Sequence, residues 1–90
     1  MAIVVKVHIP GMSVEAYESV VSQLETVGSA NPPGRLYHVA YGSAGNVQVL
    51  DVYDSLLSFE NFGKTLFPLI EPMGIEFQPE VHEVFNIMEG

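Results

Sequence analysis

The sequence has 90 residues with 11 acidic and 3 basic side chains, a formal net charge of −8 and no cysteine. This length fits one domain over residues 1–90, and without cysteine it has no disulfide, thiolate metal site or cysteine nucleophile. Three basic side chains are too few to neutralise a row of phosphates, so we expect neither nucleic acid nor an anionic membrane as a partner.

The apolar content is high for such a small chain. Hydrophobic residues make up 48% of the sequence and charged residues 16%, whereas about a quarter of an average domain is charged. A small monomer has too little interior to bury this excess. Residues 1–11 lack the basic start and cleavage site of a signal peptide, and no stretch reaches the ~18 apolar residues of a spanning helix. We therefore expect a cytoplasmic protein that hides an apolar surface against a partner.

The first half of the chain predicts a strand, a helix and a hairpin. A strand over Ile3–Ile9 alternates its apolar side chains, and a helix capped by Ser13 ends at Gly28. Strands over Leu36–Tyr41 and Val47–Tyr53 follow, joined by a short link that contains glycine. Such a link predicts an antiparallel hairpin with a positive φ at Gly45.

The second half predicts one more helix and one more strand. Asp54 or Ser55 caps a helix over Leu56–Leu69, in which Pro68 kinks or ends the regular hydrogen bonding. An extended segment over 75–78 then leads into a strand over Glu80–Met88.

The element order β-α-β-β-α-β predicts a ferredoxin-like α+β sandwich, with a four-stranded antiparallel sheet and both helices on one face. The other face of the sheet is then open to water, although both faces of these strands are apolar. The side chains of Tyr37, Val39 and Tyr41 lie on one face of the hairpin. The candidates for the opposite face are Leu36, Ala40, Leu50 and Val52. We expect a homodimer formed through the open sheet face.

Several segments carry a resemblance to a known superfamily. The segment 34–40, a short turn, Val49 to Ser55 and then Phe59 to Phe62 are similar to the dimeric α+β barrel superfamily. Within it, the chain resembles small uncharacterised proteins near the antibiotic-biosynthesis monooxygenase domains. The most typical piece is the junction Val52-Tyr53-Asp54-Ser55 between strand and helix; relatives often have Trp at the position of Tyr53.

The resemblance implies an apolar pocket between sheet and helices. It implies cofactorless monooxygenase, isomerase or cyclase chemistry on a small aromatic or polyketide-like molecule. The haem-degrading branch has an Asn on the first strand and a His on the second helix, and this chain has neither. The cyclases draw a His from the end of that helix, where this chain has Leu66-Phe67-Pro68. We therefore expect no cofactor and no metal.

Two strand residues are the candidate catalytic groups. His38 lies in mid-strand, where it is a candidate general base, since imidazoles are suited to proton transfer near neutral pH, or a half-buried His bonded to a carbonyl. Asp51 lies in a strand type that disfavours Asp; it either orients a His or forms an interface salt bridge with Arg35 or Lys6. A three-residue hairpin loop pairs His38 with Leu50, whereas a two-residue loop places His38 and Asp51 together.

Aromatic side chains are the candidate ligand contacts. Tyr37 and Tyr53 are able to hydrogen-bond and stack on an aromatic ligand, and Phe59 and Phe62 are able to line an apolar pocket. The helical spacing of Tyr17 favours packing instead. His8, His82 and nearby acids form a weak metal pattern without motif spacing. The competing function is a non-catalytic dimer, either ligand-binding or purely structural.

Overall fold

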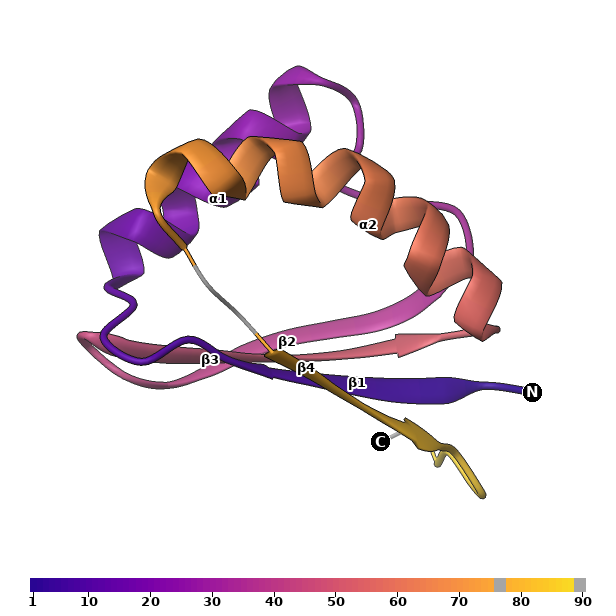
Figure 1. The fold of residues 1–90 in the computed structure, drawn as a ribbon. Helices are drawn as coiled ribbons and strands as arrows, with labels where there is room; N and C mark the ends of the chain where they lie inside the picture. The colour runs from indigo at the N-terminus through magenta and orange to yellow at the C-terminus, as the bar shows by residue number, and fades with distance from the viewer. Residues whose placement is uncertain (76–77, 89–90) are drawn as a thin grey trace.

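A computed structural model describes residues 1–75 and 78–88. Helices and strands follow the predicted order (Figure 1). The elements are β1 (Ile3–His8), α1 (Val14–Thr26), β2 (Arg35–Ser43), β3 (Asn46–Tyr53), α2 (Leu56–Ile70), a 3-10 turn η1 (Glu71–Met73) and β4 (Gln78–Glu83). The sheet has the order β2-β3-β1-β4 with antiparallel neighbours throughout. Both helices cover the same face of this sheet (Figure 1), which confirms the ferredoxin-like sandwich.

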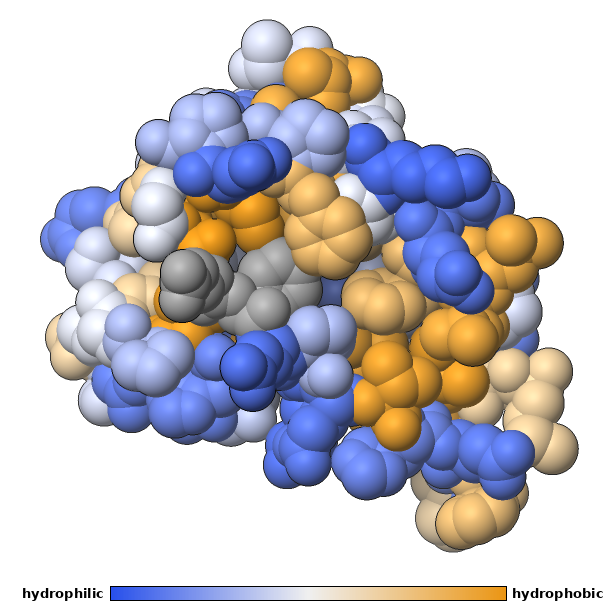
Figure 2. Space-filling model, viewed as in Figure 1, coloured by the Kyte–Doolittle hydropathy of each residue, from blue (hydrophilic) through white to orange (hydrophobic). Residues whose placement is uncertain are grey.

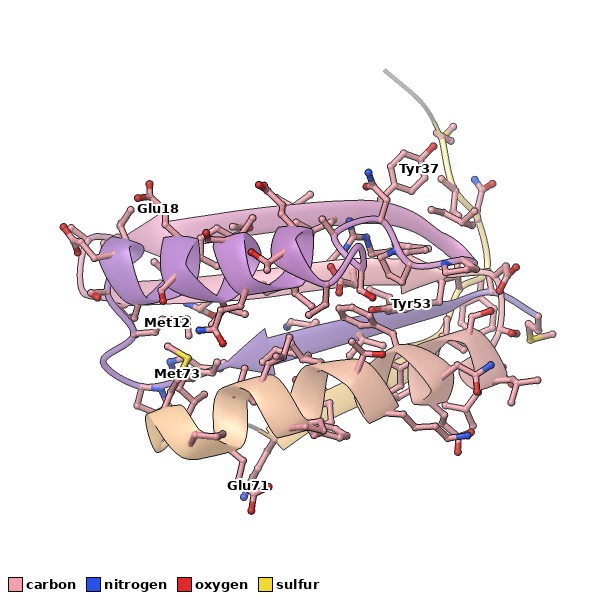
Figure 3. The ribbon with its side chains drawn as sticks, turned by 90° about the horizontal axis from the view of Figure 1, so that it is seen from above. Met12, Glu18, Tyr37, Tyr53, Glu71 and Met73 are labelled. Carbon is pink, nitrogen blue, oxygen red and sulfur yellow. The ribbon has the colours of Figure 1, made fainter. Side chains whose placement is uncertain are left out.

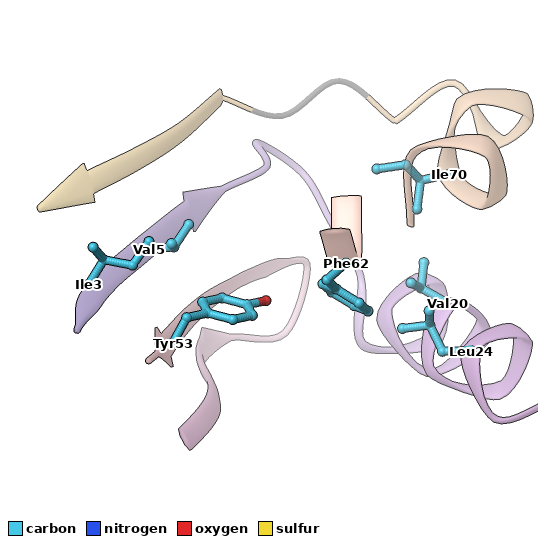
Figure 4. Packing of buried hydrophobic residues seen from close by; sticks show 7 residues of the cluster. All are labelled: Ile3, Val5, Val20, Leu24, Tyr53, Phe62 and Ile70. Carbon is cyan, nitrogen blue, oxygen red and sulfur yellow. The ribbon is translucent and has the colours of Figure 1, made fainter. Parts of the chain in front are cut away.

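The core fills the space between the sheet and the two helices (Figure 4). Strand alternation turns Ile3 and Val5 of β1 and Tyr53 of β3 toward the helices. Opposite them, the helices contribute buried residues at helical spacing to the same core, which are Val20, Leu24, Phe62 and Ile70. Tyr53 is fully buried, with its ring 5.4 Å from that of Phe59 and 6.4 Å from that of Phe62. The aromatic side chain that ends β3 therefore anchors the sheet to α2.

Local hydrogen bonds explain where the helices begin. Ser13 Oγ accepts from the backbone N–H of Ala16 at 3.0 Å, and Ser55 Oγ accepts from that of Ser58 at 3.2 Å. Each side chain thereby satisfies an N–H that has no partner inside the helix. Ser55, rather than Asp54, is the cap of α2.

The β2–β3 hairpin has a two-residue turn, because Ser43 pairs with Asn46. Gly45 in this turn has φ +80°, as predicted for a tight hairpin. The register also places Leu50 opposite Val39 and Val52 opposite Tyr37. Paired residues lie on the same face of a sheet, so Leu50 and Val52 share the open face with the tyrosines, and their expected assignment to the other face is wrong.

The end of the chain differs from expectation in two places. Helix α2 continues past Pro68 to Ile70 and then tightens into the 3-10 turn. Strand β4 ends at Glu83, not Met88, because Glu83 already pairs with Ile3, where β1 begins. Beyond that pair, the N–H of Val84 donates to the carbonyl of Ala2. Part of the extended segment expected over 75–78 lies outside the described residues.

Exposed apolar side chains remain on the surface. On the open face of β2, Tyr37, Val39 and Tyr41 are between 39% and 49% exposed. A second group gathers where the start of α2 meets the N-terminus (Figure 2); Leu56, Leu57 and Met1 are the exposed apolar residues there. Within the part of the chain that the structure describes, no helix has the length and apolar character needed to cross a membrane.

Candidate functional site

The hairpin register brings the two candidate catalytic residues together. His38 of β2 and Asp51 of β3 are cross-strand partners, and both turn toward the helices. The two-residue turn decides this, because a loop one residue longer would have paired His38 with Leu50. His38 Nδ1 lies 2.5 Å from Asp51 Oδ1. The pair is the arrangement in which a carboxylate orients an imidazole.

Two tyrosines extend the pair into a chain of four hydrogen-bonded side chains. On one side, the hydroxyl of Tyr17 from α1 lies 2.7 Å from His38 Nε2, with the two rings within 6° of parallel. On the other side, the hydroxyl of Tyr53 donates to Asp51 Oδ2 at 3.0 Å. The order Tyr17–His38–Asp51–Tyr53 runs from a partly exposed side chain to a fully buried one. We call these four residues the polar chain.

The polar chain lines an apolar cavity of about 200 Å³ between sheet and helices. Its walls are mainly valine, leucine, isoleucine and phenylalanine side chains, including Val49, Phe59, Phe62, Leu66 and Ile75. Seen from above, Tyr53 lies between the two helices, while Met12 and Met73 approach each other toward the opposite end (Figure 3). An apolar cavity with a few convergent polar groups is the usual form of a small-molecule site.

Burial changes the acidity of both tyrosines. Burial, reinforced by the negative charge of Asp51, raises the pKa of Tyr53 far above its ordinary value of 10.0. The same two causes raise the pKa of Tyr17, and Arg35 opposes them in both cases. Both hydroxyls therefore stay protonated near neutral pH and act as hydrogen-bond donors toward the pair between them.

Asp51 does not form the alternative salt bridge with Arg35 or Lys6. Its carboxylate is 8% exposed and is held by His38 and Tyr53 on the helix side of the sheet. The guanidinium of Arg35 donates instead to the carbonyl of Ala30 at 2.6 Å. Arg35 nevertheless lines the cavity and is its one basic side chain among the described lining residues.

The structure separates Tyr37 from the other candidate ligand contacts. Tyr53, Phe59 and Phe62 line the cavity, whereas Tyr37 does not. Because successive residues of a strand point to opposite faces, Tyr37 lies on the open face when His38 faces the helices. In the view from above it projects away from the space between the helices (Figure 3). Tyr37 therefore lies on the open face of the sheet, away from the cavity.

The candidate metal residues remain apart. His8 pairs with Gln78 and His82 pairs with Val4, at different levels of the sheet. His82 lies 3.8 Å from Glu80, with both side chains exposed. Among residues 1–75 and 78–88, no group of three histidine or acidic side chains is placed to hold a metal.

Tyr17 is the residue of the site that sequence patterns did not select. Its three- and four-residue spacing with Val20, Val21 and Leu24 correctly places it on the inner face of α1. A hydroxyl on that face needs a polar partner, and the two predicted hairpin strands held a histidine and an acid in mid-strand, His38 and Asp51. This need for a partner was the available signal.

Comparisons with solved structures give the same architecture. Rv0793 from Mycobacterium tuberculosis aligns with a TM-score of 0.74 and 11% identity over 99% of this chain and 100% of that one. SnoaB from Streptomyces nogalater, a cofactor-independent oxygenase, has a TM-score of 0.62 and 14% identity over 99% and 96%. A proposed antibiotic biosynthesis monooxygenase from Caulobacter crescentus CB15 has a TM-score of 0.65 and 22% identity over 97% of this chain and 91% of that one.

Neither a family model nor a curated protein matches the sequence. Identities between 11% and 22% establish a shared fold and leave the chemistry to be argued from the site. The sequence resemblance is confirmed at that level: the chain has the ferredoxin-like α+β fold of the antibiotic-biosynthesis-monooxygenase-like structures.

Proposed function

We propose that the protein binds a small aromatic or polyketide-like molecule in the cavity and removes an acidic proton from it, with His38 as the base. The observation that carries this proposal is the hydrogen-bonded pair of His38 and buried Asp51 at the wall of an apolar cavity. A carboxylate beside an imidazole fixes its tautomer and stabilises the cation formed when it accepts a proton.

Proton removal is a step common to the three reaction classes that the resemblance implies. Loss of a proton from a phenol or an enolisable carbon leaves an electron-rich anion. That anion is the species that reacts with oxygen, is reprotonated elsewhere in an isomerisation, or attacks an electrophile in a cyclisation. SnoaB, described as a cofactor-independent oxygenase, supports the first of these. The proposal covers the proton transfer and the binding that precedes it.

The test uses 4-nitrophenol, whose phenolate absorbs visible light and whose phenol does not, and 4-nitroanisole, which has no ionisable proton. We expect both to bind the wild-type protein, and bound nitrophenol to ionise at a lower pH than free nitrophenol. His38→Gln should bind both ligands without this shift, because an amide donates to Asp51 as the imidazole does but is no base.

Two phenylalanine variants distinguish binding in the cavity from binding elsewhere on the protein. Val49→Phe adds a ring to the cavity wall, and Val27→Phe adds the same ring at an exposed position at the end of α1. We expect the first to lose 4-nitroanisole binding and the second to retain it. Equal binding by both variants, or unchanged nitrophenol ionisation in His38→Gln, would refute the proposal.

We also propose that two copies pack their open sheet faces together. Tyr37, Val39 and Tyr41 make this face apolar along the middle of β2. The acids of the helices, Glu15, Glu18, Glu25, Glu60 and Glu71, are exposed on the other side of the molecule. Their repulsion therefore acts at a distance from the paired sheets and is screened by salt. An isologous pair would cover the same patch on both copies.

A further inference from the structure

Both nitrogens of the His38 imidazole already have partners. Nδ1 lies 2.5 Å from Asp51 Oδ1, and Nε2 lies 2.7 Å from the hydroxyl of Tyr17. The oxygens of Asp51 are occupied too, because Oδ2 accepts from Tyr53. An imidazole nitrogen holds one in-plane hydrogen bond. A ligand proton therefore reaches His38 either by displacing Tyr17 or through its hydroxyl.

The direction of the hydrogen bonds follows from the carboxylate. Ionised Asp51 only accepts, so the hydroxyl of Tyr53 and the Nδ1–H of His38 both donate to it. In neutral His38 this leaves Nε2 as the acceptor, and the hydroxyl of Tyr17 is its donor. The lone pairs of the Tyr17 oxygen then remain available for a proton from a ligand.

Tyr17 is also the accessible end of the polar chain. Tyr53 is fully buried and Asp51 nearly so, whereas Tyr17 is partly exposed, His38 is exposed, and both line the same cavity. A ligand in the cavity meets both side chains at its wall, but the two nitrogens of His38 are engaged, so the lone pairs of the Tyr17 oxygen are the open acceptor.

We propose that Tyr17 is a catalytic residue that relays the proton from the ligand to His38. The acidic O–H or C–H bond of the ligand breaks as its proton moves to the Tyr17 oxygen. In the same step the original O–H of Tyr17 breaks and its proton moves to His38 Nε2. The products are the ligand anion, an unchanged tyrosine and an imidazolium held by Asp51, so protons and charge balance without an oxidant or cofactor. This inference rests on the proposed function of the cavity.

The raised pKa of Tyr17 is consistent with a residue that passes a proton on, and not with a base that is already deprotonated when the ligand binds. Burial and the charge of Asp51 keep the phenol protonated, so Tyr17 gives up its own proton only while receiving another. A hydroxyl that bridges donor and acceptor makes such a transfer possible.

The experiment compares the wild-type protein with Tyr17→Phe, using the same two ligands. Phenylalanine keeps the ring in the cavity wall and removes the bridging oxygen. We expect 4-nitroanisole to bind both proteins with affinities within about twofold, since it exchanges no proton. We expect the rate at which bound 4-nitrophenol ionises after a temperature jump to be lower in Tyr17→Phe by about tenfold or more.

A second replacement retains the hydroxyl. Incorporation of 3,5-difluorotyrosine at position 17 keeps ring, oxygen and hydrogen bond but makes the hydroxyl more acidic, and a relay should respond with a changed rate of nitrophenol ionisation. This variant decides the matter if Tyr17→Phe disturbs the cavity.

The outcomes separate the inference from the function on which it rests. A wild-type rate of nitrophenol ionisation in both Tyr17 replacements would overturn the relay and leave His38 as a base reached directly. Failure of 4-nitroanisole and 4-nitrophenol to bind the wild-type protein would overturn both the cavity function and the relay.

Discussion

The hydroxyl of Tyr53 donates a hydrogen bond of 3.0 Å to Oδ2 of Asp51, which lies two residues earlier on the same strand. Residues two apart on a strand share a face, so this bond forms inside the helix-covered core, where both side chains are buried. The tyrosine thereby holds the carboxylate in place while His38 binds its other oxygen. This contact links the packing of the core to the orientation of the candidate base.

Tyr53→Phe should destabilise the fold by about 1–3 kcal/mol, the cost of leaving a buried acceptor short of one hydrogen bond. Thr26→Val is the control, because it removes a hydroxyl whose hydrogen bond lies at an exposed position of α1, and it should change stability by less than about 0.5 kcal/mol. Urea unfolding of the three proteins measures both effects. Equal stabilities of Tyr53→Phe and the wild type would show that Asp51 does not depend on this bond.

Stability should fall at alkaline pH because of the buried tyrosines. The folded pKa of Tyr53 lies above its unfolded value of 10.0. Above that value, the unfolded chain has lost a proton that the folded chain keeps, so the free energy of unfolding decreases as pH rises, by about 1.4 kcal/mol per pH unit. Below the unfolded pKa the contribution is fully present. Urea unfolding measured over roughly pH 8 to 11, which brackets the ordinary pKa of tyrosine, should show this slope.

Tyr53→Phe should reduce the alkaline slope, because the replacement has no proton to lose. Its unfolding free energy should approach that of the wild type as pH rises above the unfolded pKa of tyrosine. The same slope in both proteins would place the loss of stability elsewhere in the molecule.

Gly34 should tolerate no side chain. Its φ is +87°, and a Cβ added there would lie 2.6 Å from Ser58 Cβ and 2.7 Å from Asp54 Oδ1. The backbone is fixed too, since the carbonyl of Gly34 accepts from the N–H of Asp54 at 2.8 Å. Gly34→Ala therefore combines the strain of a left-handed residue, about 1–2 kcal/mol, with a steric clash.

Gly28→Ala isolates the conformational part of this cost. Gly28 has a similar φ of +76°, with nothing near the added Cβ. Thermal or urea unfolding should rank the proteins as wild type, Gly28→Ala and Gly34→Ala in decreasing stability. Equal losses in the two variants would mean that the loop before β2 moves to accept the methyl group.

The proposed dimer should dissociate when a charge is placed on the open face. Val39→Asp puts a carboxylate in the middle of β2, where Val39 is 49% exposed, and Val27→Asp puts the same charge at an exposed position after α1. Burying an unpaired carboxylate is costly, so Val39→Asp should sediment as a monomer. The wild type and Val27→Asp should sediment as dimers at micromolar concentration; a wild-type monomer would contradict the proposed packing.

The sequence predicted the fold well because its local signals agree. Alternation in Ile3–His8, the cap at Ser13 and the glycine turn before Asn46 each specify one element, and their order leaves few topologies. The length of β4 was not predictable from its own residues, because a strand ends where its neighbour ends.

The site was harder to predict because it depends on register. His38 and Asp51 were identifiable as polar residues in apolar strands, but their pairing required the length of the hairpin turn. Tyr37 lies outside the cavity because a residue next to His38 in sequence points to the opposite face of the sheet. Tyr17 joins the site through a contact between α1 and β2, and such a contact depends on how the helix packs over the sheet.

The central claim is that His38 receives a proton from a molecule bound in the cavity. The most direct test is ¹⁵N NMR of the His38 ring in the wild-type protein, before and after saturation with 4-nitrophenol. We predict a proton on Nδ1 alone in the free protein, and protons on both Nδ1 and Nε2 once the bound ligand shows phenolate absorption. A bound nitrophenolate with an unchanged His38 ring, or bound nitrophenol that stays protonated, would contradict the account.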